Sequence, residues 1–191
     1  MRDYHHIDRY LNELRQDIYV QPPDPWHTQM TMEAVNKFIA YMPGTWSVLD
    51  VGCGQGFSKA IFAAHSMVWT GVTLGEDYKV AKEAGLNVLE EDFSFLPMGA
   101  GQFDLIFSRH SLEHSPMPLL TLMEWWRVGK KWLFLILPTP SYWLWGGRNH
   151  YGMLEDAQAK FLLDRAGWRI VKEDNSDLHE YRYLCEHYDR E

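Results

Sequence analysis

Two groups of residues in this sequence have types and spacings that could carry out chemistry. The first is a glycine-rich turn, residues 52–56 (Gly-Cys-Gly-Gln-Gly), which directly follows an apolar run at 48–51. Glycines after a buried strand let the backbone turn tightly and approach a ligand closely. A helix that starts there adds N–H groups and a partial positive charge. The second group is His110-Ser111-Leu112-Glu113-His114, whose imidazole and carboxyl groups can exchange protons.

The second group also has the H-x-x-E-H spacing of a zinc-binding helix found in one class of metalloprotease. Such a site needs both histidines on one helix face and further ligands downstream. Pro116 and Pro118 follow at once and disfavour a long helix through both histidines. We therefore assign no metal ligand here and interpret the segment as a loop, in which His110 faces a ligand and His114 is structural.

The elements that must position these groups alternate along the chain. Strand-length apolar runs occur at 46–51, 67–73, 86–90, 103–107, 132–137, 168–172 and 181–186, with helical patterns at 57–65, 76–84, 118–127 and 153–166. Alternation of this kind predicts an α/β fold with seven strands, a mostly parallel sheet and helices on both faces. The last two strands have no helix between them, which predicts an antiparallel hairpin at the sheet edge. Ligands bind such sheets at the carboxyl ends of the strands.

A proline-rich break at residues 21–25 separates an N-terminal segment from this alternation. Apolar residues recur at helical spacing over 5–19 and again over 35–42, where Pro43-Gly44 ends the pattern. We predict a single domain with a helical extension at 1–44 and a ligand-binding core at 45–191. The helix at 5–19 is expected to cover the site as a partial lid, with a dimer contact as the alternative.

Composition limits the possible partners. The 191 residues include 18 Lys and Arg against 26 Asp and Glu, a net charge of −8, which disfavours nucleic acid as a partner. No apolar stretch is long enough to span a membrane, and the N-terminal residues are polar and charged. The two cysteines, Cys53 and Cys185, do not form a disulfide framework. We expect a cytoplasmic monomer or homodimer with a small-molecule substrate.

The glycine-rich turn, preceded by Asp50-Val51, resembles the first motif of the class I S-adenosylmethionine (SAM) methyltransferases, and specifically their small type 11-like domains. The segments 71–74, 91–98, 103–114 and 149–168 are similar to later motifs of that family in the same order. The resemblance covers residues 45–175 and implies a Rossmann-like fold. It also implies SAM as the cofactor and S-adenosylhomocysteine as its product.

The resemblance assigns cofactor contacts to nine residues. Gly52 and Gly54 would approach the methionine part, Asp92 the adenine amino group, and Thr73 the ribose. The remaining contacts fall to Asp50, Gln55, Leu74, Phe93 and Ser108. The family usually has an acidic residue where this chain has Thr73. Glu76 or Asp77 could reach the ribose instead, although we favour the interpretation that they are acidic residues stabilised by the helix dipole.

The catalytic residues are also assigned by resemblance, which places the loop after the fourth strand beside the methyl group. His110 is the expected general base, because an imidazole of ordinary pKa, about 6.5, removes protons near neutrality. His150 and Tyr151, on the loop after the fifth strand, are the reserve candidates. The aromatic segment 142–151 is expected to form a wall of the substrate pocket, with cover of the sheet end or a dimer contact as alternatives.

These features together predict a SAM-dependent methyltransferase that acts on the oxygen or nitrogen of a small molecule. The alternative is a module that binds SAM or S-adenosylhomocysteine without turnover. A nicotinamide-dependent dehydrogenase is disfavoured, because Phe57 stands where a dinucleotide fingerprint needs glycine and because the acid that would hold the ribose is missing.

Overall fold

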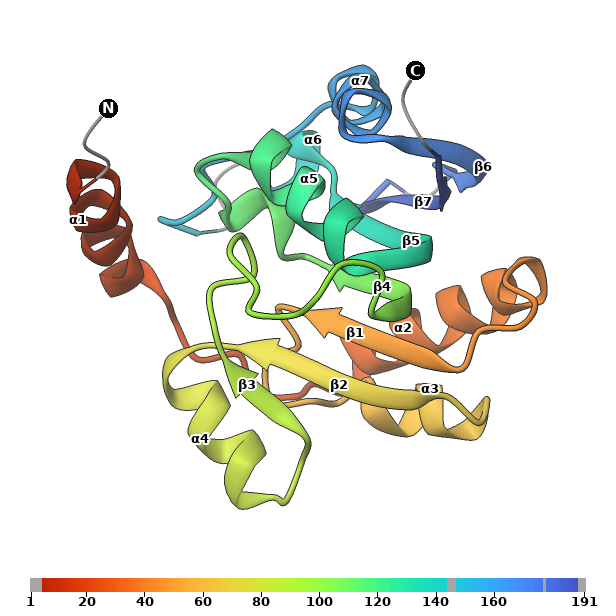
Figure 1. The fold of residues 1–191 in the computed structure, drawn as a ribbon, viewed down its shortest axis with the longest axis horizontal. Coiled ribbons are helices and arrows are strands. Elements are labelled where there is room, and N and C mark those ends of the chain that lie inside the picture. The colour runs from red at the N-terminus through yellow and green to blue at the C-terminus, as the bar shows by residue number, and fades with distance from the viewer. Residues whose placement is uncertain (1–4, 144–146, 177, 189–191) are drawn as a thin grey trace.

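The computed structural model describes residues 5–143, 147–176 and 178–188, and it contains the predicted seven-stranded sheet in the order β3-β2-β1-β4-β5-β7-β6 (Figure 1). The strands β1 to β5 are parallel, and β7 runs antiparallel to both β5 and β6. The α/β class and the C-terminal hairpin are therefore confirmed. The strands are β1 (Ser47–Val51), β2 (Val68–Thr73), β3 (Val88–Glu90), β4 (Phe103–Arg109), β5 (Gly129–Pro138), β6 (Trp168–Asp174) and β7 (Glu180–His187).

Helices cover both faces of the sheet. The helices α2, α3 and α4 pack on one face, whereas α5 and α7 pack on the other. The helices are α1 (His5–Leu14), α2 (Pro25–Phe38), α3 (Lys59–Ala64), α4 (Gly75–Glu83), α5 (Pro118–Val128), α6 (Pro140–Trp143) and α7 (Asp156–Ala166). Three short 3-10 segments lie at Arg15–Asp17, Ile39–Tyr41 and Leu112–His114. In the part of the chain described here, no helix has the length and apolar character that a membrane crossing requires.

Alternation along the central strands divides the core between the two faces. Val48 of β1 packs with α2 and α3, and its neighbour Leu49 packs with α5 and α7. Trp125 of α5 is fully buried, and its indole N–H donates to the carbonyl of Phe93 (2.9 Å). Truncating a buried side chain of this size costs about 3–5 kcal/mol. The core thus fixes the loop after β3 as well as the sheet.

One edge of the sheet collects the carboxyl ends of the five parallel strands. Because β7 runs the opposite way, its first residue, Glu180, pairs with Pro138 at the end of β5. The loops after these strands therefore meet the beginning of β7 at this edge. Two boundaries differ from the predicted ones in a way that matters here: β4 continues past Phe107 to Arg109, and α1 ends at Leu14.

Candidate active site

A cavity lies at this edge, and we call it the edge cavity. It is lined by residues from the ends of β1, β2, β4 and β5, from the loop after β3, and from the chain segment between α1 and α2. The glycine-rich turn and the segment 109–114 both line it, although they are far apart in the sequence. The structure thus brings together the two groups that the sequence singled out.

The glycine turn has a backbone that only glycine adopts easily. Gly52, Gly54 and Gly56 have φ values of +77°, +52° and +83°. A Cβ on Gly52 would lie 2.1 Å from the Oγ of Ser111, so the turn packs directly against the loop after β4. A Cβ on Gly54 would meet only the carbonyl oxygen of Gln21, at 3.8 Å, and Gly54 lines the cavity. The turn therefore presents bare backbone to a ligand at Gly54.

Asp50 stabilises this turn through hydrogen bonds. Its carboxylate is buried and accepts hydrogen bonds from the hydroxyl of Ser58 and from the indole N–H of Trp69. Burial raises the pKa of Asp50 to about 6, although both hydrogen bonds act in the opposite direction. Asp50 is not among the residues that line the cavity, so its side chain fixes the start of the following helix rather than facing a ligand.

Asp77, in the first turn of α4, lines the cavity close to Thr73 and Leu74, which line it as expected. The carboxylate is buried, and it accepts hydrogen bonds from the backbone N–H of Gln21 (3.1 Å) and from the side-chain amide of Gln55 (3.0 Å). Gln55 thus positions Asp77 and is not itself among the lining residues. From the sequence, stabilisation by the helix dipole was the favoured interpretation of Asp77, and contact with a ligand was the alternative. The position of Asp77 in the cavity supports the alternative.

Glu76, the neighbouring acid, has a different environment. Its carboxylate is exposed and pairs with the Nζ of Lys79 (2.9 Å). Of these two adjacent acids, Glu76 therefore faces solvent and Asp77 lines the edge cavity.

The loop after β3 contributes Glu91 and Phe93 to the cavity lining. Asp92 lies between them and is half-buried, and its Oδ1 accepts a hydrogen bond from the backbone N–H of Ser94 (2.9 Å). Asp92 is not among the residues that line the cavity, so its contact with adenine stays a prediction. Ser108, also expected near the cofactor, is fully buried inside β4 and does not line the cavity.

His110 lines the cavity at the end of β4 and has a φ of +49°, a left-handed conformation that is uncommon for a residue with a side chain. Its Nε2 lies 2.9 Å from the Oε1 of Glu180. Glu180 also pairs with Arg109 (2.5 Å) and Arg182 (2.9 Å). Although burial raises the pKa of Glu180, its contacts with His110 and the two guanidinium groups outweigh this and lower the pKa to about 2.

Burial, aided by the nearby charge of Arg109 and opposed by Glu180, lowers the pKa of His110 to about 4. The expected value of about 6.5 is therefore wrong for this residue. The two arginines already compensate the charge of Glu180, so little of that charge is available to hold a proton on the imidazole. His110 is therefore neutral at pH 7.

The two reserve candidates for the general base, His150 and Tyr151, lie in different environments. His150 lines the cavity, next to His114 and Glu113. Tyr151 is partly exposed and is not among the lining residues, because its hydroxyl donates to the carboxylate of Asp17 (2.8 Å). Burial and this carboxylate raise the pKa of Tyr151 to about 12. The expected aromatic wall involves the side chains of residues 142–146, which lie outside what the structure describes.

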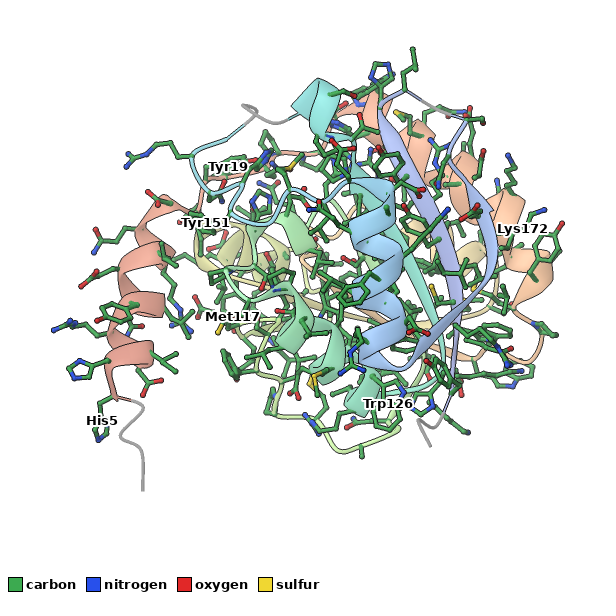
Figure 2. All side chains as sticks on the ribbon, turned by 90° about the horizontal axis from the view of Figure 1, so that it is seen from above. His5, Tyr19, Met117, Trp126, Tyr151 and Lys172 are labelled. Carbon is green, nitrogen blue, oxygen red and sulfur yellow. The ribbon has the colours of Figure 1, made fainter. Side chains whose placement is uncertain are left out.

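The predicted lid, residues 5–19, lines the edge cavity only at its C-terminal end. The helix α1 has no buried residues and stands apart from the body, with His5 at its outer end (Figures 1 and 2). From this end of the chain, the lining residues lie within 18–28. They include Ile18 and Tyr19 from the end of the predicted lid, together with the proline-rich break and the start of α2. Tyr19 lies there with its ring 6.1 Å from that of His114. The division into 1–44 and 45–191 stays a prediction.

Comparisons with known proteins find one domain match within the chain. Residues 49–136 match the profile of a methyltransferase domain. This part of the chain is therefore a methyltransferase domain. A ubiquinone biosynthesis O-methyltransferase of Coxiella burnetii is 37% identical over 78 residues, which cover 37% of this chain and 33% of that protein. The chain thus aligns with about a third of the length of that relative.

Solved structures show that the methyltransferase fold extends beyond the matched residues. A protein of Pyrococcus horikoshii superimposes with a TM-score of 0.75 at 15% identity, covering 88% of this chain and 94% of the other. The magnesium protoporphyrin IX methyltransferase of Synechocystis, solved with bound S-adenosylhomocysteine, superimposes with a TM-score of 0.66 at 18% identity and covers 97% of both chains. The Rossmann-like fold of the methyltransferase domain is therefore confirmed.

Proposed function

We propose that the protein transfers a methyl group from SAM to the oxygen or nitrogen of a small molecule bound in the edge cavity. The observation that carries this proposal is the convergence of the glycine turn, Asp77, Phe93 and His110, which come from four strand ends, on one cavity. When bound, SAM supplies a methyl group already activated on a sulfonium. The chain then has to position the acceptor and, for a hydroxyl, assist loss of its proton.

The residues present fit this cofactor. Gly54 leaves backbone open to the cavity, as the amino-acid end of SAM requires. A carboxylate has about four lone-pair positions, and the contacts with Gln21 and Gln55 leave Asp77 with capacity for ribose hydroxyls. Phe93 lines the cavity beside this group and offers a ring to the adenine. We propose that Asp77 takes the ribose contact for which Thr73 is unsuited.

His110 is the proposed base for the acceptor. Its Nε2 lies 2.9 Å from the Oε1 of Glu180, so this carboxylate holds the ring at the end of β4. Glu180 is the positioning residue, held by Arg109 and Arg182. An imidazole with a pKa near 4 is a weak base for a hydroxyl group, so a hydroxyl acceptor needs a further source of activation.

Binding of S-adenosylhomocysteine, measured by titration calorimetry, tests the first part of the proposal. Gly54→Leu should abolish the heat of binding, because the new side chain projects into the cavity. Gly85→Leu is the matched control, since Gly85 has a φ of +73° and nothing within 4 Å of an added Cβ. Both variants carry a backbone strain of about 1–2 kcal/mol, so only the loss of ligand space distinguishes them.

Transfer is tested by incubating the protein with SAM and a panel of phenols, catechols and amines, and detecting methylated products by mass spectrometry. No heat and no thermal shift with S-adenosylhomocysteine would refute the cofactor. Binding without transfer to any acceptor would support the non-catalytic module instead.

A further inference from the structure

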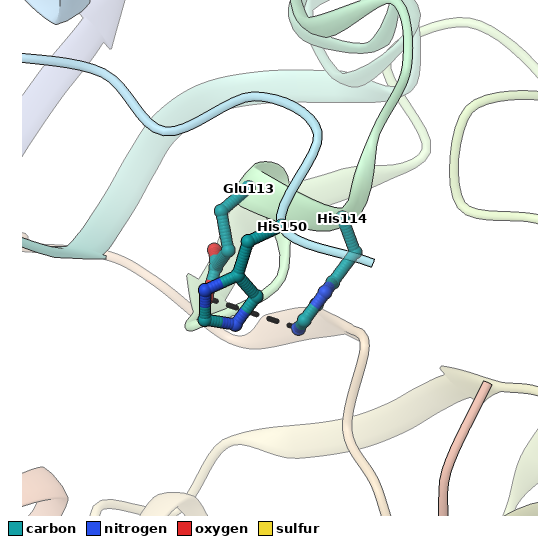
Figure 3. Close-up of side chains that lie close together, drawn as sticks. All are labelled: Glu113, His114 and His150. Carbon is teal, nitrogen blue, oxygen red and sulfur yellow. Dashed lines mark ion pairs between the residues drawn. The ribbon is translucent and has the colours of Figure 1, made fainter. Parts of the chain in front are cut away.

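Three potential metal ligands lie close together in the lining of the edge cavity. Glu113 and His114 come from the 3-10 segment Leu112–His114, and His150 comes from the loop after α6. Figure 3 shows the three side chains close together, with the carboxylate of Glu113 beside the ring of His150. One donor atom from each residue lies within 4.8 Å of those of the other two. Donors around a metal at about 2.1 Å lie roughly 3–4 Å apart, so small imidazole rotations would close the set.

Glu113 supplies an independent observation that points to a ligand. Its side chain is 3% exposed and lines the cavity, yet its Oε2 has no hydrogen-bond partner among the described residues. Leaving a buried carboxylate oxygen without a partner is costly. The other oxygen, Oε1, lies 3.8 Å from the Nε2 of His114, which is too long for a hydrogen bond. The carboxylate is therefore placed for a partner that the described residues do not supply.

His114 is oriented as a metal-binding histidine would be. Its Nδ1 lies 3.2 Å from the carbonyl oxygen of Asn149, to which it donates a proton. In the neutral imidazole this leaves the lone pair on Nε2, the nitrogen that faces Glu113. A backbone carbonyl that accepts from the non-ligating nitrogen is the usual support of a metal-bound histidine. The same loop that supplies His150 therefore also fixes the orientation of His114.

We propose that Glu113, His114 and His150 bind a divalent transition-metal ion in the edge cavity. Two imidazole nitrogens and one carboxylate oxygen suit Zn²⁺, Co²⁺ and related ions better than Mg²⁺ or Ca²⁺. Three protein ligands leave coordination positions open towards the cavity. If the protein is a methyltransferase as proposed, an acceptor oxygen can occupy an open position, where the ion lowers the pKa of a hydroxyl group.

This site differs from the zinc pattern read in the sequence. In the H-x-x-E-H pattern the two histidines would be His110 and His114, but His110 contacts Glu180 instead. The third ligand is His150, thirty-six positions beyond His114. The ion would lie beside the acceptor, where it adds to the activation given by the weakly basic imidazole of His110.

The test titrates the chelator-treated protein with Co²⁺ alone, followed by calorimetry and by the visible absorption of the ion. We expect one ion per chain, with a coordination spectrum that shows nitrogen ligands. Glu113→Gln keeps the side-chain shape and removes the carboxyl group that would bind the ion. That substitution and His150→Ala should each weaken Co²⁺ binding by more than about 100-fold, beyond the 10–100-fold typical of losing an outer-shell partner. His150 lies on a loop, so His150→Ala decides the matter if Glu113→Gln fails to fold.

The control removes the exposed pair His5 and His6, which could bind Co²⁺ adventitiously. The double variant His5→Ala with His6→Ala should bind Co²⁺ as the unmodified protein does. Failure to bind a stoichiometric ion would overturn the inference, as would binding that survives both cavity substitutions. These titrations contain no SAM and no acceptor, so their outcome is independent of S-adenosylhomocysteine binding, which tests the proposed function.

Discussion

The adjacent acids Glu76 and Asp77 allow the cofactor proposal to be tested by two substitutions that remove the same charge. In Asp77→Asn the carboxylate facing the cavity becomes an amide, whereas in Glu76→Gln the change falls on a carboxylate in solvent. We expect S-adenosylhomocysteine to bind more weakly to Asp77→Asn and with unchanged affinity to Glu76→Gln. The comparison cancels any effect of net charge on the protein.

The expected loss of affinity in Asp77→Asn follows from the contacts of Asp77. The buried carboxylate keeps lone pairs for ribose hydroxyls beyond those used by Gln21 and Gln55. A hydrogen bond to a charged group contributes about 1.5–3 kcal/mol, which corresponds to roughly a tenfold to hundredfold loss of affinity. Gln55→Leu removes one donor to Asp77 but keeps the charge, so its effect should be smaller.

Titration calorimetry gives the affinities, and the melting temperature without ligand shows whether each variant folds. Equal losses in the Asp77 and Glu76 variants, or a larger loss in the Glu76 variant, would mean that the ribose contact is misplaced. An Asp77→Asn variant that melts normally and binds with full affinity would refute the reasoning outright.

Three further outcomes are expected. His110→Ala should lower the turnover number by about 10²–10⁴ while calorimetry shows unchanged cofactor affinity. Because the base is the neutral imidazole and its pKa is about 4, the His110-dependent activity should be level between pH 6 and 7 and fall only as the pH drops towards 4; a loss centred near pH 6.5 would contradict the structure. Asp92→Ala should weaken S-adenosylhomocysteine binding by roughly tenfold to a hundredfold, and an unchanged titration would remove Asp92 from the adenine site. Deleting residues 1–17 should leave that affinity intact, whereas deleting residues 1–23 should reduce it, because the proline-rich break lines the cavity; equal affinities for the two deletions would contradict this.

The sequence was sufficient for the sheet because short, mostly apolar segments of strand length alternate with helical patterns. The glycine turn was equally readable, since only a bend with positive φ needs three glycines in five residues. The role of Asp77 was ambiguous for a physical reason: an acid in the first turn of a helix is stabilised by the dipole whether or not it faces a cavity. The burial of Asp77 depends on the tertiary position of the proline-rich segment, whose Gln21 donates a hydrogen bond to it.

Other features depend on register and could not be read from spacing. Glu180 begins an unremarkable final strand, and its contact with His110 follows from the antiparallel pairing of β7 with β5. The lowered pKa of His110 follows from the same placement together with burial. Likewise, His150 meets Glu113 only because the loop after α6 crosses the 3-10 segment that follows β4.

The reversed direction of β7 has a consequence for how the protein is made. Arg109 and Glu180 are separated by 71 positions, and Glu180 is translated after every other residue named at the edge cavity except Arg182. A nascent chain can therefore form the glycine turn and its supporting strands while His110 still lacks its carboxylate. Long-range pairing of this kind also forms slowly. The proposed cofactor-binding half of the site would be in place during synthesis, and the proton-accepting half would follow only when the last strand has joined the sheet.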